Sequence, residues 1–250
     1  MLARRSLLAL SALLVAKPAF AAWPDQPVKL VVPFTPGTGP DIIARFVGEK
    51  LATTLGQPVV IDNVAGASGN IGSAQVARAK PDAYTLMSSV NTLVMNASLF
   101  KTLPYDPVAD FQPITLTAWG SLVLVAHPSQ APNNVAELVV AAKAKPRVLT
   151  YGSPGVGTPH HLSMALVETA TGIDVDMWYG LFAPRGTPMD LVERLNRDVA
   201  AILAAPEARA AFEAQGLVPA SSTPAALAEI VVRDRARWAE VVAKRGIVPE

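Results

Sequence analysis

The sequence predicts an α/β fold, because short apolar runs alternate with amphipathic helical segments along it. Between residues 28 and 89 the pattern reads strand, helix, strand, helix, strand, and from Thr187 onward it is largely helical. The chain has 250 residues, of which 51% are hydrophobic and 16% charged, so it can bury a large core. We therefore expect mostly parallel sheets covered by helices.

The first 21 residues have the pattern of a secretory signal. Arg4 and Arg5 precede the apolar stretch SLLALSALLVA, and Ala19-Phe20-Ala21 offers the small residues that a signal peptidase cleaves between. The apolar stretch is shorter than the about 20 residues that a membrane anchor needs. We expect residues 1–21 to be a cleavable signal peptide, used by the general or the twin-arginine route, and the mature chain to be exported.

Charge and cysteine content exclude several classes of protein. Removal of the signal leaves 18 basic residues against 20 acidic ones, a net charge of about −2. A nearly neutral chain without a basic run gives no reason to expect nucleic acid as a partner. The sequence has no cysteine, so it offers neither disulfides nor thiolate metal sites.

The first elements follow in order. VKLVV (residues 28–32) is short and rich in β-branched residues, as is typical of a buried parallel strand. Apolar residues then recur at helical spacing over residues 42–51, and Gly56 ends that helix. Residues 58–62 (PVVID) predict a second strand, residues 68–79 a helix and residues 84–89 (YTLMSS) a third strand.

The second half continues the alternation and then changes. Residues 122–128 (LVLVAHP) and 148–153 (VLTYGS) predict strands on either side of a helix over 134–145. The C-terminal region predicts helices over residues 189–204, 206–216 and 224–246, with Gly216 and Gly246 as helix-ending glycines.

Two similar loops indicate where a ligand binds. PFTPGTGPD (residues 33–41) and YGSPGVGTPHH (residues 151–161) each follow a predicted strand, contain Pro-Gly-x-Gly and lead into a helix. The unpaired N–H groups and the positive dipole end at a helix N-terminus attract anions. One terminus contributes only about 0.3–2 kcal/mol, whereas micromolar affinity needs about −8 kcal/mol. We therefore expect the two loops to converge on one anionic ligand.

Other interpretations of these loops stay open or fail. A tight strand-to-helix turn needs glycine without any ligand, and Thr38, Asp41, Ser153 and Thr158 could be helix N-caps, which is the interpretation we favour for Asp41. Neither loop has the dinucleotide fingerprint, the P-loop or the nucleophile elbow. His160 and His161 are adjacent and diverge on a helix, so we expect no metal site. A serine hydrolase using Ser153 and His161 lacks an acid placed by the sequence.

Five stretches of the sequence together resemble one family. They are VKLVVPFTPGTGPDIIAR, DNVAGASGNIGSAQVARAKPDAYTL, SLFKTLPYDPVADFQPIT, LTYGSPGVGTPHHLS and GLFAPRGTPMDLVERLN. They look like the Bug family, the extracytoplasmic solute receptors of tripartite tricarboxylate transporters. The resemblance implies a type II periplasmic-binding-protein fold, in which two α/β lobes joined by two crossing strands close on a small organic acid. It also implies a periplasmic, monomeric, non-enzymatic receptor without cofactor that serves membrane transporter subunits.

The resemblance also implies ligand-binding residues. They lie in the two loops and on the floor between them: Phe34, Thr35, Gly37, Thr38, Asp41, Gly66, Asn70, Asn91, Ser153, Gly155, Gly157, Thr158 and His161. Two local departures from the family pattern stand out. The second glycine of the first loop has moved, and Ala83 stands where the family has glycine, which costs about 1 kcal/mol if the turn needs a positive φ.

A larger departure follows TGIDVDM, where a stretch worth about two βαβ units of ~30 residues each is absent. We expect lobe 1 to consist of residues 22–121 and 179–250, and residues 122–178 to be a remnant of lobe 2. Because so small a remnant cannot build a full core, we expect residues 148–153 to become an exposed sheet edge and ligand closure to weaken or fail. The alternatives to a receptor are the serine-type hydrolase and a degenerate family member that no longer binds solute.

Overall fold

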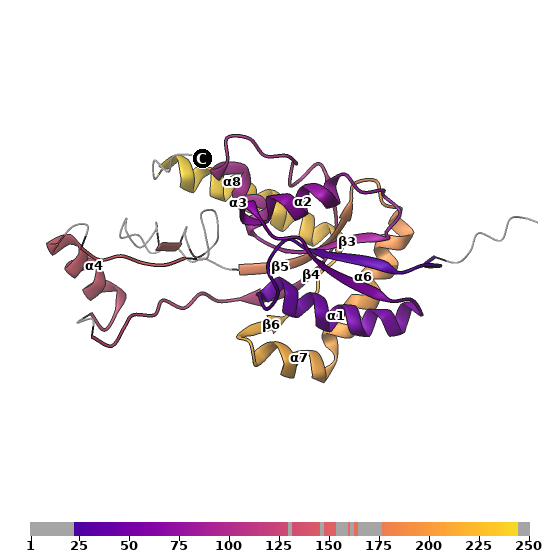
Figure 1. Cartoon of the computed structure of the whole chain (residues 1–250), viewed down its shortest axis with the longest axis horizontal. Coiled ribbons are helices and arrows are strands. Elements are labelled where there is room, and N and C mark those ends of the chain that lie inside the picture. Colours follow the sequence, from indigo (N-terminus) through magenta and orange to yellow (C-terminus); the bar gives the residue numbers. More distant parts are fainter. Residues whose placement is uncertain are drawn as a thin grey trace, which may run out of the picture.

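The computed structural model describes residues 23–129, 132–145, 148–153, 160, 163–164 and 177–244. Within them one sheet has six strands: β1 (Val28–Val32), β2 (Val59–Asn63), β3 (Thr85–Val90), β4 (Phe111–Gly120), β5 (Met177–Pro184) and β6 (Leu217–Pro219). Their order across the sheet is β2-β1-β3-β5-β4-β6, and helices lie on both faces (Figure 1). The predicted α/β class is therefore confirmed.

One half of the sheet is parallel. β1 pairs in parallel with β2 and with β3, and the helices α1 (Gly39–Leu55) and α2 (Asn70–Ala77) make the crossovers, the second one through the short 3-10 helix η1 (Ala67–Gly69). The three strands run in the same direction, so their carboxyl ends share one edge of the sheet. The loops that follow the three strands therefore start at the same edge.

The other half is antiparallel, so the sheet is mixed and the prediction of a mostly parallel sheet was wrong for this half. β5 runs antiparallel to β3 and to β4, and β6 runs antiparallel to β4. The chain leaves the sheet at the end of β4 and returns through β5 beside it, with Gly120 opposite Met177. A strand that returns at the edge it left must run in the opposite direction, which is why the parallel alternation stops here.

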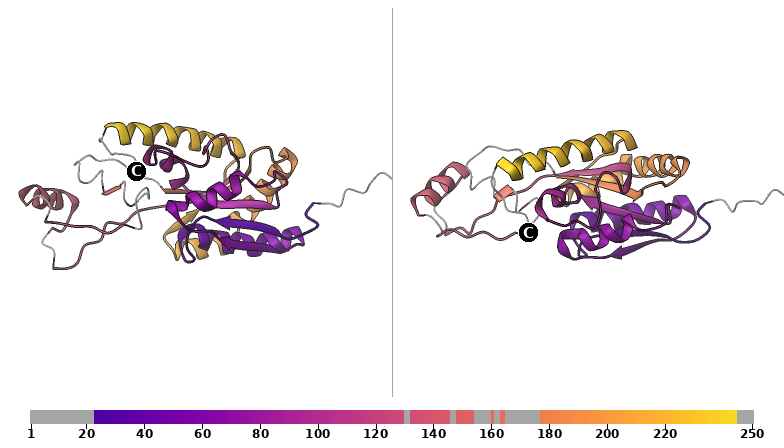
Figure 2. Two further views of the ribbon diagram at one scale, coloured as in Figure 1. Left: turned by 45° about the horizontal axis from the view of Figure 1, so that its top comes forward. Right: turned by 90° about the horizontal axis from the view of Figure 1, so that it is seen from above.

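The core has two layers, one on each face of the sheet. One face is covered by α1, α6 (Met189–Ala204) and α7 (Pro206–Glu213), and the other by α2, α3 (Thr92–Leu99) and α8 (Pro224–Lys244) (Figures 1 and 2). Successive residues of β1 serve opposite layers, since Leu30 belongs to the first cluster and Val31 to the second.

The described residues of the segment between β4 and β5, α4 (Val135–Ala144) among them, lie beyond the edge of the sheet (Figure 1). The predicted helix is present as α4, but none of its residues is buried. Residues 122–128 and 148–153 form no strand, so both predicted strands, and the predicted sheet edge at 148–153, were wrong. A strand needs a partner for its N–H and C=O groups, and the described residues offer none there. Apolar side chains on this segment are exposed, namely Val123, Leu124, Val125, Val135, Val140, Val148, Leu149 and Tyr151.

Other local predictions hold. The three C-terminal helices are present as α6, α7 and α8, and Gly56 ends α1 in the left-handed conformation with φ of +70°. Ala83 is buried with φ of +62°, as its glycine-like position predicted. The signal sequence and Gly246 lie outside the described residues. In the part of the chain that the structure describes, the helices are all too short or too polar to span a bilayer.

Candidate functional site

The candidate site lies where the parallel strands end. Residues 33–38 follow β1, residues 64–66 follow β2 and Asn91 follows β3. Ligands of open α/β sheets bind at the carboxyl ends of such strands. The structure brings together at this edge the predicted site residues of the first lobe: Phe34, Thr35, Gly37, Thr38, Asp41, Gly66, Asn70 and Asn91.

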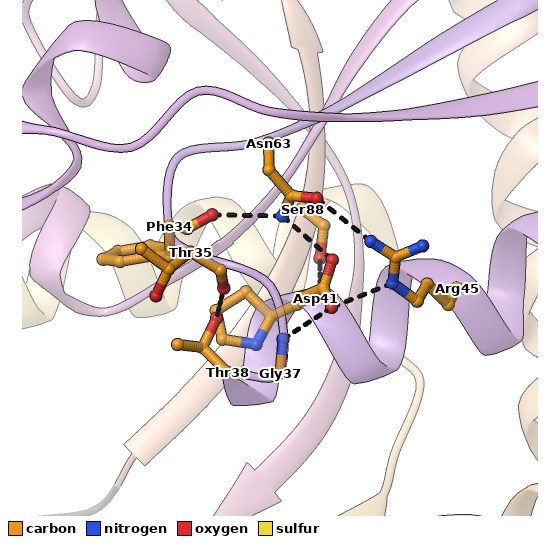
Figure 3. A network of polar contacts seen from close by, with 9 residues as sticks. Phe34, Thr35, Gly37, Thr38, Asp41, Arg45, Asn63 and Ser88 are labelled. Atoms are coloured by element: carbon orange, nitrogen blue, oxygen red, sulfur yellow. Dashed lines mark hydrogen bonds and ion pairs between the residues drawn. The ribbon is translucent and has the colours of Figure 1, made fainter.

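The first loop turns sharply into α1 (Figure 3). Gly37 has φ of +83°, and its N–H donates to Oδ2 of Asp41 at 2.8 Å. The hydroxyl of Thr38 donates to the carbonyl oxygen of Thr35 at 2.8 Å. The N-cap is therefore Thr38, without a side-chain capping bond, and the interpretation of Asp41 as N-cap was wrong. Asp41 lies in the first turn and reaches back to the loop instead.

The carboxylate of Asp41 is the centre of a polar network and is only 2% exposed. It accepts from Nε of Arg45 at 2.9 Å and from Nδ2 of Asn63 at 2.9 Å, and the same amide nitrogen donates to the carbonyl oxygen of Phe34 at 3.1 Å (Figure 3). Burial raises the pKa of Asp41, but the hydrogen bonds from Arg45, Gly37 and Asn63 outweigh burial and leave the pKa below its usual value. The carboxylate thus holds the loop through Gly37, and the guanidinium of Arg45 balances its negative charge.

Main-chain donors remain at the start of α1. The N–H groups of Asp41 and Ile42 both donate to the carbonyl oxygen of Thr38, and Pro40 has no N–H. Within the described residues, the N–H groups of Thr38 and Gly39 have no acceptor. Together with the positive end of the 17-residue helix they form an anion-attracting position.

The loop that follows β2 is strained, and it contacts the loop that follows β1. Residues 66–69 all have positive φ, including Ala67 at +46° and Ser68 at +54°. Gly69 packs so closely on the ring of Phe34 that a Cβ atom there would lie 3.1 Å from Cζ. Strained backbone of this kind is often found at binding sites.

Two of the predicted site residues are buried asparagines. Oδ1 of Asn70 accepts from Nδ2 of Asn96 at 2.6 Å and from the hydroxyl of Tyr105 at 2.9 Å. The N–H of Asn91 donates to the carbonyl oxygen of Trp178 at 3.2 Å, which joins the end of β3 to β5. Both residues are buried, Asn91 with 0% exposed, and their part in a ligand site stays a prediction.

The second predicted anion loop is described only in part. Gly155, Gly157, Thr158 and His161 lie outside the described residues. Ser153 is half-buried at the end of residues 148–153. The convergence of the two loops on one ligand, and the pairing of Ser153 with His161, stay predictions.

Tyr179 of β5 lies at this edge and was not among the predicted site residues. Its ring lies against the first turn of α1, so that a Cβ atom on Gly39 would be 2.7 Å from its Oη. Burial raises the pKa of Tyr179 to about 12. The contact joins residues 140 positions apart and gives a physical reason for the moved glycine, because only glycine at position 39 leaves room for the phenol. Arg45, four residues after Asp41, could have been found from helix spacing.

Comparisons with known proteins identify the family. The family model "Tripartite tricarboxylate transporter family receptor" matches residues 43–176. Protein BugT of Bordetella pertussis is 26% identical over 304 aligned positions, which cover 93% of each chain. Since 93% of this chain is only about 230 residues, about 70 positions of that alignment have no counterpart here. The chain is thus shorter than its relatives, as predicted.

Solved structures agree with the family. The periplasmic binding protein BugD is 26% identical with a TM-score of 0.81, and 91% of this chain covers 100% of it. Rpa4515 of R. palustris, solved with adipate, is 28% identical with a TM-score of 0.84, covering 91% of this chain and 100% of that one. MatC of Rhodopseudomonas palustris, with bound malate, is 25% identical with a TM-score of 0.78, covering 88% and 99%. BugD is thus a periplasmic binding protein, and Rpa4515 and MatC hold dicarboxylates.

The α/β fold, the family model over more than half of the chain and the Bug relatives lead to one conclusion: the chain belongs to the tripartite tricarboxylate transporter receptor family, the Bug-type periplasmic solute-binding proteins.

Proposed function

We propose that the chain is an exported receptor that captures a small dicarboxylate in the periplasm and delivers it to the membrane subunits of a tripartite tricarboxylate-type transporter. The observation that carries this proposal is the N-terminus of α1, where two N–H groups lack an acceptor among the described residues and the nearest carboxylate, Asp41, is bound to Arg45. The structural neighbours with adipate and malate support a ligand with two carboxylates.

In this proposal the ligand is held between two loops, with residues 22–121 and 179–250 as lobe 1 and residues 122–178 as the remnant of lobe 2. The first loop supplies Phe34, Thr35, Gly37 and Thr38, and the second supplies Ser153, Gly155, Gly157, Thr158 and His161. Because α4 buries no residue, the remnant has little packing to hold its loop in place. We propose that closure is weakened, so that the affinity is lower than in a receptor with two complete lobes.

Isothermal titration of the mature chain, starting at Ala22, tests the receptor proposal. Malate, adipate and citrate are titrated alongside adipamide, which has the length of adipate without its charge. We expect binding of at least one acid and none of the amide, because the helix terminus recognises charge. Absence of binding to every acid would favour a degenerate family member, whereas tight binding would contradict the weakened closure.

A second experiment, an assay of ester turnover, distinguishes a receptor from a hydrolase. Ester turnover by the wild type that disappears in Ser153→Ala would contradict the receptor proposal. A receptor shows no turnover in either protein, and at most a changed affinity in Ser153→Ala.

A further inference from the structure

Tyr179 is a buried residue whose hydroxyl lies against the start of α1. The residue is only 5% exposed. Its ring lies between two glycines, since a Cβ atom on Gly39 would be 2.7 Å from Oη and one on Gly120 would be 3.1 Å from Cε2. In the described part of the chain no group forms a hydrogen bond with this hydroxyl, whereas the hydroxyls of Tyr84 and Tyr105 bind Asp25 and Asn70. The hydroxyl is therefore free to donate a hydrogen bond to a ligand at this place.

The hydroxyl lies at the first turn of α1. Gly39 is the first residue of that helix, and its own N–H and that of Thr38 are the two main-chain donors without an acceptor among the described residues. The helix has 17 residues, long enough for its N-terminus to carry the full dipole effect. Three donors and a positive helix end thus meet at one place, while Asp41 is directed to Arg45.

We infer that the hydroxyl of Tyr179 donates a hydrogen bond to the carboxylate that the N-terminus of α1 binds, so that lobe 1 by itself holds a complete site for one carboxylate. The inference rests on the proposed function and goes further, because it assigns a binding residue on β5 and needs no residue of the predicted lobe 2. A pKa of about 12 keeps this hydroxyl protonated, and therefore a donor, at any physiological pH.

The site also explains how the first carboxylate of a ligand is recognised when the second lobe is reduced. Hydrogen bonds to a charged group are stronger than those between neutral groups. Tyr179 is fixed by its packing between two glycines, so little side-chain entropy is lost when the ligand binds. We therefore expect Tyr179 to contribute mainly to affinity, and its hydroxyl to contribute nothing to the stability of the free protein.

The test uses the mature chain labelled with ¹³C at tyrosine Cζ, which gives four signals for the four tyrosines. Acetate, malate and adipate are titrated, and the Tyr179 signal is assigned from Tyr179→Phe or by elimination with the other Tyr→Phe variants. We expect the Tyr179 signal to move and the Tyr84 signal to stay. Tyr179→Phe should weaken binding about tenfold or more, equivalent to about 1.4 kcal/mol, without lowering the melting temperature. Tyr84→Phe is the matched control and should bind like the wild type.

The outcomes separate the inference from the proposed function. If a dicarboxylate binds but the Tyr179 signal is still and Tyr179→Phe binds equally well, the inference is wrong and the receptor proposal stands. If the signal moves with millimolar acetate while calorimetry detects no dicarboxylate, the carboxylate site is supported and the receptor proposal fails. If no acid binds and no signal moves, both are overturned.

Discussion

The indole nitrogen of Trp178 donates a 2.6 Å hydrogen bond to Oδ2 of Asp234, and both side chains are buried. Trp178 lies on β5, directly before Tyr179, where the chain returns to the sheet. Asp234 lies in the middle of α8. The bond therefore fixes the C-terminal helix to the strand that carries the proposed binding residue.

Substitution of Asp234 by alanine should lower the free energy of unfolding by about 1–3 kcal/mol, because the buried indole N–H loses its acceptor. Asp234→Asn keeps an acceptor oxygen and should lose less. Urea denaturation followed by tryptophan fluorescence measures both variants. Equal losses in the two would mean that the charge of Asp234, and not its hydrogen bond to Trp178, matters.

The stabilisation by Asp41 should depend on pH. Its pKa in the folded protein lies below the ordinary 3.8, so its contribution to stability is present above that value and is lost as the pH falls through the folded pKa. We expect Asp41→Asn to be about 1–3 kcal/mol less stable at pH 7, and the difference from the wild type to shrink below pH 3.8.

Denaturation of both proteins at a series of pH values above and below 3.8 measures this difference in the free energy of unfolding. Asp62→Asn serves as the control, because Asp62 forms an exposed pair with Lys29 that should contribute only about 0–1 kcal/mol. A difference between Asp41→Asn and the wild type that stays constant with pH would contradict the assignment of the effect to the ionised carboxylate.

Gly39→Ala should destabilise the protein by about 1–3 kcal/mol, although alanine is the better helix former, because the added Cβ meets the Tyr179 ring. The cost should fall in a Tyr179→Leu background, which has no ring at that place. A double-mutant cycle measured by thermal denaturation gives the coupling between the two positions. Additive effects would show that the ring moves away without cost.

A shortened chain should fold. Gly120 and Met177 face each other at the ends of β4 and β5, so an Asn-Gly turn can replace residues 121–176. Closing the hairpin with two residues instead of 56 should add roughly 2–3 kcal/mol, since a shorter loop loses less entropy on folding. Circular dichroism and urea denaturation test this. A shortened chain that is unfolded or less stable would show that the removed segment supports the sheet.

Apolar side chains of that segment should contribute little to stability. Val123 and Val125 are 80% and 81% exposed, so replacing both by threonine should change the free energy of unfolding by less than about 0.5 kcal/mol. Val31→Thr, in the core, should cost about 1–3 kcal/mol because it buries a hydroxyl. A large loss at the exposed positions would reveal that another chain covers them in solution.

Local patterns predicted the elements whose own sequence determines them. The amphipathic helices α1, α6 and α8 and the β-branched strand β1 were found from spacing and composition. β4 was missed because Pro113 interrupts it, and α3 because nearly all of its sides are buried and it has no polar face to give a helical period. Residues 122–128 and 148–153 show the converse, since strand-like composition without a pairing partner gives no strand.

The residues of the candidate site also form two groups: those that the local sequence marks and those that only the fold brings together. The first loop was predicted because glycine and proline mark it in the sequence. The bond between Asn63 and Asp41 and the contact between Gly39 and Tyr179 join distant parts of the chain, so only the folded structure brings them together. The role of Asp41 was mistaken because its acidic side chain fits an N-cap as well as it fits a residue that holds the loop.

The pairing of Gly120 with Met177 has an evolutionary and a practical consequence. The segment between these two residues begins and ends at paired positions of the sheet, so its length can change without a change in the pairing of β4 with β5. We expect a shorter segment to be accommodated there for the same reason that foreign domains are accepted at closely spaced termini. This junction is therefore a natural place to graft a reporter or an unrelated binding module onto the protein.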